Sequence, residues 1–186
     1  VEPNKEMREK SVSLLSHYNK FNAVDGAAEA TSLPDKSVDL IIAGQAFHWF
    51  DRERAKQEFK RILKKEGYVL LLWNERLTRS AFEKQYEDLI CRHGNSYRKV
   101  DHRNIRLEDI QAFFSPGHVS LKAFANCQRF DFKGLLGRLL SSSYMPATAD
   151  PGYPAMAQEL KSLFDRCQQA GQVQIDYDTN LYIGQF

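Results

Sequence analysis

Three aromatic side chains and a histidine follow one another from Phe47 to Phe50, directly after an apolar stretch. Aromatic faces attract cations, and a histidine can accept a proton near neutral pH, so this segment can serve a cationic ligand or an acid–base step. A lone histidine is more often a packing residue, and rings at the end of a strand more often belong to the core. We therefore expect Phe50 or Trp49 to be structural.

The apolar stretch before these rings, Val38–Ala43, has the composition of a parallel strand that is covered by helices on both faces. Similar stretches alternate with helical spacings of apolar residues along the first half of the chain. The pattern predicts a helix from the Asn4 cap to about Tyr18, a strand at 21–25, the strand at 38–43, a helix capped by Asp51, a strand at 68–73 and a helix around 82–90. Such alternation favours an open parallel α/β sheet.

The last third of the chain changes character. Residues 119–127 and 173–177 alternate between apolar and polar side chains, which is typical of antiparallel strands. An apolar segment at 135–140 and an amphipathic helix from Met156 to Cys167 lie between them. We expect these two strands to form an antiparallel pair at one edge of the sheet.

Ligands of an open parallel sheet bind beyond the carboxyl ends of its strands. These ends read VEPN, VDGAAEA, AGQAFHWF and LWNER, so the aromatic residues lie on the predicted binding rim. Glu2 is the most informative residue, because a carboxylate at the end of the second strand can accept hydrogen bonds from both hydroxyls of a ribose. The alternative is a frayed terminal residue without a role.

Four segments together resemble the class I S-adenosylmethionine-dependent methyltransferases: VEPNKEMR, AVDGAAEATSLPDKSVDLIIAGQAFHWFD, EFKRILKKEGYVLLLWN and the final VQIDYDTNLYIGQF. The resemblance is to the small-molecule branch, methyltransferase type 11, with the ubiquinone/menaquinone-type and trans-aconitate-type enzymes. It covers most of residues 1–76 and the last strand, whereas 77–170 match only in architecture. It implies a Rossmann-like α/β fold with a mostly parallel, seven-stranded sheet whose last strand is antiparallel.

The resemblance implies S-adenosylmethionine as the cofactor and no metal. The ribose hydroxyls would bind Glu2, the adenine would lie at the Ala28 backbone and near Glu29, and the methionine end would lie against Gln45. The implied cofactor-binding residues are Glu2, Pro3, Asn4, Met7, Asp25, Ala28, Glu29, Gln45 and Ala46. Phe47, His48 and Trp49 would form the floor between cofactor and substrate, with His48 as the candidate general base.

The sequence departs from the family pattern in two places. The turn before the fifth strand reads KKEG in place of Pro-Gly-Gly. No first strand and no glycine-rich turn precede Glu2, although that turn normally carries the main backbone contacts to the cofactor. We therefore expect six of the seven strands in this chain, and weak or no binding of S-adenosylmethionine by the chain as it stands. Either further residues precede Val1 in the protein, or the protein is a truncated piece.

Three further features remain open at this stage. Residues 91–106 carry five arginine or lysine side chains and are either a solvated surface loop or a lid that clamps an acidic substrate. Tyr144, in SSSYMP, either faces the substrate or ends a helix. The cysteines Cys91, Cys127 and Cys167 have no metal-like spacing, and we expect them to be reduced and mostly buried.

The length and net charge of the chain bear on which kind of partner it binds. The chain has 186 residues and a formal net charge of +2, so its overall charge favours neither nucleic acid nor a membrane surface. No apolar run approaches the roughly 20 residues that span a bilayer. We expect a cytoplasmic protein with a small-molecule substrate and with neither nucleic acid nor membrane as a partner; the sequence does not indicate an oligomeric state.

Together these observations predict one methyltransferase domain over residues 1–186. Residues 1–76 form its cofactor-binding part, 77–170 mainly cap the substrate, and 171–186 form the last strand. The predicted activity moves a methyl group from S-adenosylmethionine to an oxygen or carbon of a small molecule, with acidic molecules as candidates. The alternatives are a catalytically silent, methyltransferase-like binding module or a truncated fragment, and, less favoured, a nucleotide-dependent dehydrogenase.

Overall fold

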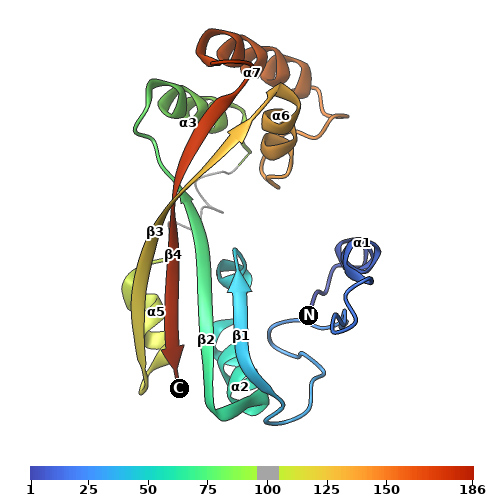
Figure 1. Ribbon diagram of the computed structural model, residues 1–186, viewed down its shortest axis with the longest axis vertical. Coiled ribbons are helices and arrows are strands. Elements are labelled where there is room, and N and C mark those ends of the chain that lie inside the picture. The colour runs from blue at the N-terminus through green and yellow to red at the C-terminus, as the bar shows by residue number, and fades with distance from the viewer. Residues whose placement is uncertain (96–104) are drawn as a thin grey trace. The chain divides into compact units, whose positions relative to one another are not determined.

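The computed structural model describes residues 1–95 and 105–186. In this part of the chain four strands are hydrogen-bonded in the order β1-β2-β4-β3 (Figure 1). They are β1 (Val38–Gly44), β2 (Leu63–Arg76), β3 (His118–Phe130) and β4 (Val173–Gln185). β1 and β2 are parallel, whereas the arrow of β4 points opposite to those of β2 and β3 (Figure 1). The mixed sheet with an antiparallel last strand and an antiparallel pair at one edge is therefore confirmed.

Six helices are described in these residues: α1 (Lys5–Leu15), α2 (Arg52–Ile62), α3 (Ala81–His93), α5 (Leu107–Phe114), α6 (Phe132–Leu140) and α7 (Tyr153–Cys167). Both predicted caps are present. The Asn4 side chain accepts a hydrogen bond from the Met7 N–H, and Asp51 accepts one from the Arg54 N–H. Helix α5 is additional to the elements that the sequence pattern predicts.

The chain divides into two compact units. The first contains residues 1–72, 105–122 and 181–186, and the second contains 73–104 and 123–180. The division falls within β2, β3 and β4, so each unit holds part of each of these strands.

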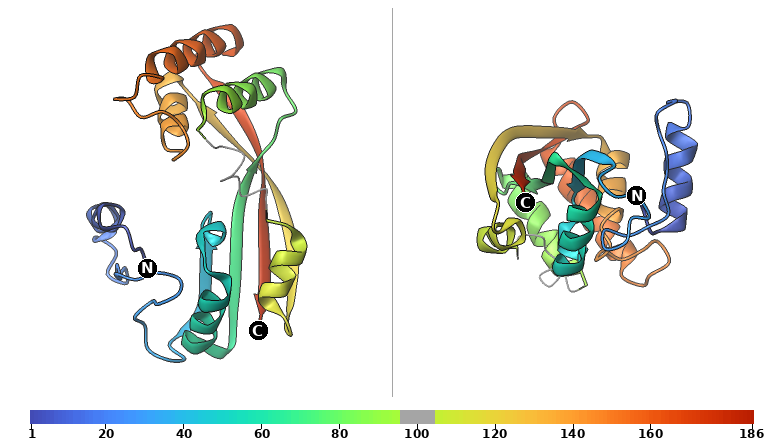
Figure 2. Two further views of the ribbon diagram at one scale, coloured as in Figure 1. Left: turned by 180° about the vertical axis from the view of Figure 1, so that it is seen from behind. Right: turned by 90° about the horizontal axis from the view of Figure 1, so that it is seen from below.

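In the first unit, α2 lies alongside β1 and the first half of β2 (Figures 1 and 2). Its apolar side chains Phe59 and Ile62 are buried together with Val69 and Leu71 of β2. The prediction that β1 is covered on both faces is wrong for the described residues. Ile42 is 61% exposed, because side chains alternate between the two faces of a strand and α2 covers only one face.

The expected strands at the N-terminus are also absent from the described sheet. Residues 21–25 are extended but belong to no strand. A backbone hydrogen bond of 3.0 Å from the Glu2 N–H to the Val24 carbonyl joins them to the first residues. A strand requires a ladder of such bonds. The described residues therefore contribute four strands to the sheet in place of the expected six.

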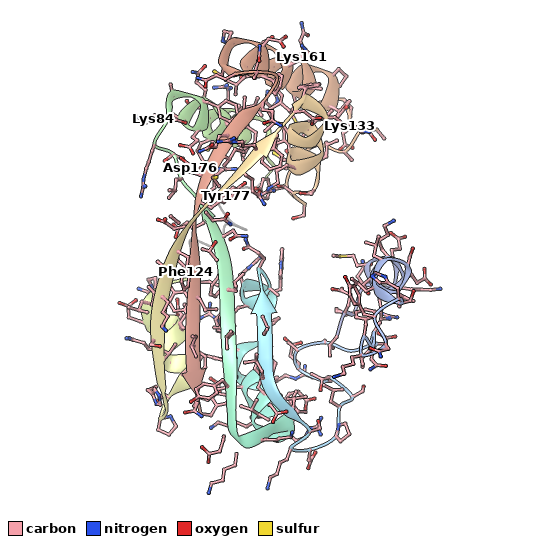
Figure 3. The ribbon with its side chains drawn as sticks, in the orientation of Figure 1. Lys84, Phe124, Lys133, Lys161, Asp176 and Tyr177 are labelled. Carbon is pink, nitrogen blue, oxygen red and sulfur yellow. The ribbon has the colours of Figure 1, made fainter. Side chains whose placement is uncertain are left out.

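The core of the second unit forms where α3, α6 and α7 pack with β4 (Figure 3). Glu83, 1% exposed, links α3 to this strand: its carboxylate accepts hydrogen bonds from the N–H groups of Ser80 at 2.8 Å and Asp176 at 2.8 Å. Burial alone would raise the pKa of Glu83, but these donors and the Arg79 N–H outweigh it, and the pKa is lowered.

The prediction that the cysteines are mostly buried is wrong. Cys91 and Cys127 are exposed and Cys167 is half-buried, and all are free thiols. Cys127 lies on β3, an edge strand on which almost every side chain is exposed, so the alternating pattern there marks no buried face. Among the described helices there is none with both the length and the apolar character needed to cross a membrane.

Candidate functional site

The first candidate segment is the loop at the carboxyl end of β1. The Gln45 N–H donates to the Leu72 carbonyl at 2.8 Å, and Gln45 adopts a φ of 54°, in the left-handed region that few non-glycine residues visit. The chain thereby turns out of the sheet directly after the strand. A short 3-10 turn, Phe47–Trp49, follows and leads into the Asp51 cap of α2.

The aromatic side chains of this turn point in different directions. Phe47 is fully buried and packs edge-to-face against Phe113, with 4.9 Å between ring centroids. Phe50 is half-buried and packs against Phe47, as expected for a structural residue. Trp49 is 63% exposed, and the half-buried His48 ring lies 4.8 Å from it. The side chains that this segment offers to a ligand are therefore His48 and Trp49, while the Phe47 ring supports them from the core.

The second candidate segment is a tight turn between Ala27 and Ala30. These two residues exchange backbone hydrogen bonds of 3.1 and 3.0 Å, which places Ala28 and Glu29 at its apex. Gly26 permits the turn, because a Cβ atom there would lie 2.9 Å from the Ala30 carbonyl oxygen. Two residues that the resemblance assigns to the adenine thus share one half-buried corner of the backbone.

A hydrogen bond connects the two segments. The Glu29 carboxylate accepts from the Asp51 N–H at 2.8 Å, at the start of α2 and one residue after the aromatic turn. Farther along the same helix, the Glu58 carboxylate accepts from the N–H of Thr31 at 2.8 Å and from its hydroxyl at 2.5 Å. Helix α2 therefore holds the turn that carries Ala28 beside the loop that carries His48.

The N-terminal residues form a third group around Arg8. The Arg8 guanidinium donates to the Glu2 carbonyl at 2.7 Å and forms an ion pair with Asp25 at 3.0 Å. The Glu2 carboxylate accepts from the Asn4 N–H at 2.9 Å, next to the exposed Pro3. The structure thus brings Glu2 and Asp25 together through an arginine that the motif did not single out.

The other predicted site residues, Met7, Ala46 and Tyr144, lie in three different parts of the structure. Met7 is 63% exposed on α1, and Ala46 is half-buried between Gln45 and Phe47. Tyr144 belongs to the second unit, where its carbonyl accepts from the Asn95 N–H at 2.8 Å and its side chain is half-buried.

The basic segment 91–106 is described only at its ends, and residues 96–104 lie outside the described part of the chain. At its start, Arg92 and His93 both contact Glu159 of α7, and the distance from the His93 Nε2 to the carboxylate is 2.7 Å. The pKa of Glu159 is lowered by His93 first and by Arg92 in addition. These two basic side chains therefore link α3 to α7.

The residues that sequence reasoning missed are Arg8, Thr31, Glu58 and Arg61. A signal for Glu58 exists in the sequence. It lies three residues after Ala55 and four before Ile62, on the stripe of α2 that is otherwise apolar and buried. A carboxylate at such a position implies a buried partner, although the spacing does not say which residue it is.

Comparison with known proteins gives a consistent result. Residues 1–71 match the family profile of the methyltransferase domain. An uncharacterised methyltransferase of Schizosaccharomyces pombe is 30% identical over 175 residues, which are 88% of this chain and 66% of the relative. A methyltransferase-like protein of the same yeast is 30% identical over 170 residues, which are 86% of this chain and 64% of that protein. The chain thus spans slightly less than two thirds of these relatives.

The fold agrees with this result. The crystal structure of YcgJ from Bacillus subtilis superimposes with a TM-score of 0.56 over 98% of this chain and 79% of that protein, at 21% identity. The sheet is of the α/β kind with an antiparallel last strand, and α2 joins the turn at Ala28 to the aromatic loop. The relatives named as methyltransferases match most of this chain. The chain belongs to the class I S-adenosylmethionine-dependent methyltransferases.

Proposed function

We propose that the first unit of this chain supplies part of an S-adenosylmethionine site and that the protein transfers the methyl group to an oxygen or carbon of a small molecule. The observation that carries the proposal is the hydrogen bond between Glu29 and the Asp51 N–H, which holds the Ala28 corner beside the loop at the end of β1. These are the two segments that would meet the adenine and the methionine end of one cofactor. We further propose that both units are parts of one domain, with a seven-stranded sheet in the whole protein.

The residues present suit the cofactor. Glu2 has a carboxylate that can accept from ribose hydroxyls once it exchanges its contact with the Asn4 N–H. The half-buried corner at Ala28 offers a backbone edge to an adenine ring. The exposed Trp49 ring offers a face to the positive sulfonium, which aromatic rings attract.

The reaction breaks the bond between sulfur and the methyl carbon and forms a bond from that carbon to the acceptor, with S-adenosylhomocysteine as the leaving group. A carboxylate acceptor is already ionised and needs only to be held in line with the methyl group. A hydroxyl or carbon acceptor must lose a proton. His48, beside Trp49 at the rim, is then the group in this loop that can accept it.

Acidic small molecules are the first acceptors to test. The basic segment 91–106 carries five arginine or lysine side chains, and arginine binds carboxylates through two parallel hydrogen bonds. The rival proposal is a silent binding module that keeps the cofactor site but transfers no methyl group. Methyl transfer from labelled S-adenosylmethionine to a panel of carboxylic acids and phenols separates the two proposals.

The decisive experiment is calorimetric titration of the protein, with any natural sequence that flanks this chain, with S-adenosylhomocysteine. We expect micromolar affinity that falls by about tenfold or more in Glu2→Ala, because the ribose then loses a charged acceptor. Glu6→Ala, an acidic residue one helical turn away and exposed, is the matched control and should leave the affinity unchanged. A folded protein that binds no S-adenosylhomocysteine would refute the proposal.

A further inference from the structure

Three positions along helix α2 form hydrogen bonds with the segment that carries the Ala27–Ala30 turn and leads to β1. All of these residues belong to the first unit. At the N-cap of α2 the Asp51 N–H donates to the Glu29 carboxylate. Two turns later Glu58 binds Thr31. One turn farther on, Arg61 donates to the Leu33 carbonyl at 2.7 Å. The loop therefore follows the helix axis, and its path depends on a few polar side chains of α2.

Glu58 is at the centre of this arrangement. It is 9% exposed and accepts hydrogen bonds from the Thr31 N–H and hydroxyl and from two nitrogens of Arg61, both at 2.8 Å. Arg61 in turn contacts Asp35 at 2.5 Å. Three of these hydrogen bonds reach Oε1 and the fourth reaches Oε2, and the negative charge is matched by a guanidinium.

An ion pair between a buried carboxylate and the Arg61 side chain, which is 37% exposed, adds little net stability, since the cost of removing the carboxylate from water offsets most of the attraction. What it does provide is a defined position for its partners. Thr31, 4% exposed, follows Ala30, whose backbone closes the turn that carries Ala28 and Glu29. A shift of Thr31 therefore shifts the corner of the backbone that meets the adenine.

We propose that Glu58 is a positioning residue for the cofactor, acting through Thr31 on the turn at Ala28 and Glu29. It does not touch the cofactor and takes no part in the methyl transfer. The inference rests on the proposed function, because it assumes that this turn contacts S-adenosylmethionine. The inference adds to the proposed function the residue that fixes the turn at Ala28 and Glu29, which is Glu58 acting through Thr31.

The test compares Glu58→Ala, Glu58→Gln and the control Glu83→Ala in the same calorimetric titration with S-adenosylhomocysteine, well below the lowest unfolding midpoint. Glu83 is also a buried carboxylate that accepts backbone N–H groups, but it lies in the second unit. We expect Glu58→Ala to raise the Kd by about tenfold or more, because small displacements of a contact surface are costly. Glu58→Gln keeps an oxygen that accepts from Thr31, so it should restore most of the affinity. Glu83→Ala should lower the unfolding midpoint without changing the Kd.

Each other outcome decides the question. Equal Kd values for wild type and Glu58→Ala overturn the inference and leave the proposed function intact. An equal loss of affinity in Glu83→Ala shows a general effect of stability and also overturns it. A wild-type protein that binds no S-adenosylhomocysteine refutes the proposed function, and the inference falls with it.

A second variant covers the case in which Glu58→Ala does not fold. Thr31→Val removes the hydroxyl but keeps the N–H that donates to Glu58, so it should fold and weaken binding by a smaller factor. Thr31→Ser restores the hydroxyl and should restore the affinity. If Thr31→Val binds S-adenosylhomocysteine as tightly as the wild type does, the link between Glu58 and the turn is not used.

Discussion

Replacement of Glu83 by alanine should destabilise the protein by about 3 kcal/mol. The carboxylate accepts three backbone hydrogen bonds: from Arg79 at 2.9 Å, from Ser80 at 2.8 Å and from Asp176 at 2.8 Å. Residues 79 and 80 are exposed, so water can replace the carboxylate there, and the loss is that of one helix cap, about 1 kcal/mol. The Asp176 N–H is in the sheet, and leaving it without an acceptor adds about 1–3 kcal/mol.

Glu83→Gln separates the two contributions. The amide keeps one acceptor oxygen, but its NH₂ group must face one of the N–H donors, so we expect a loss of about 2 kcal/mol. Asp88→Asn is the matched control, since it also removes one negative charge from α3 but at an exposed position, and it should change stability by less than about 0.5 kcal/mol.

The measurement is unfolding in urea at pH 7, with the midpoint and the slope fitted separately. The slope should stay constant, because the variants are expected to change stability and not the surface exposed on unfolding. The folded pKa of Glu83 is lowered, so its contribution is complete above the usual value of 4.5 and is lost as the pH falls through the folded pKa. The difference between wild type and Glu83→Gln should therefore shrink in acid. A loss in Glu83→Ala no larger than that of Asp88→Asn would refute the reasoning.

Two further changes test the structure elsewhere. The pKa of Glu58 is lowered from 4.5 to about 2, mainly by its hydrogen bonds from Arg61, so Glu58→Gln should be less stable than wild type at pH 7, by at most about 3 kcal/mol. The two unfolding curves should converge as the pH falls from 4.5 towards 2, and a gap that is independent of pH would contradict this. Gly117→Ala should cost at least about 2 kcal/mol, because its Cβ would lie 2.0 Å from the Gln185 carbonyl oxygen. Gly137→Ala, in the exposed interior of α6 with no atom within 4 Å of its Cβ, should instead gain about 0.5–1 kcal/mol in thermal unfolding, and a loss there would contradict the placement of α6.

Local signals in the sequence predicted the elements well where one residue decides the backbone. The Asn4 and Asp51 side chains cap α1 and α2 as expected, because an N-cap depends on contacts within four residues. The 3.6-residue period also predicted which side of α3 and α7 is buried, since Tyr86 and Leu160 face the core of the second unit.

The same reasoning failed where the environment of an element lies far away in sequence. Val38–Ala43 is a strand, yet the apolar character of both its faces did not mean that both are covered, and Ile42 is exposed. An apolar run reports which residues can be buried and not which partner buries them. The alternation at 119–127 had the same ambiguity, and it marks an exposed edge strand.

The candidate site shows why a motif can locate a ligand and still miss what holds it. The segments around Ala28 and His48 follow directly from strand ends, because the carboxyl edge of a parallel sheet is a property of its topology. The residues that hold these segments are distant from them in sequence: Glu58 is 27 positions after Thr31, and Asp51 is 22 positions after Glu29. Nothing in the spacing identifies those pairs. The position of Glu58 indicates only that a carboxylate on the buried side of α2 needs a hydrogen-bonding partner. Because one helix carries that carboxylate and also follows the aromatic loop, a substitution on α2 that never meets a ligand should change both halves of the site together.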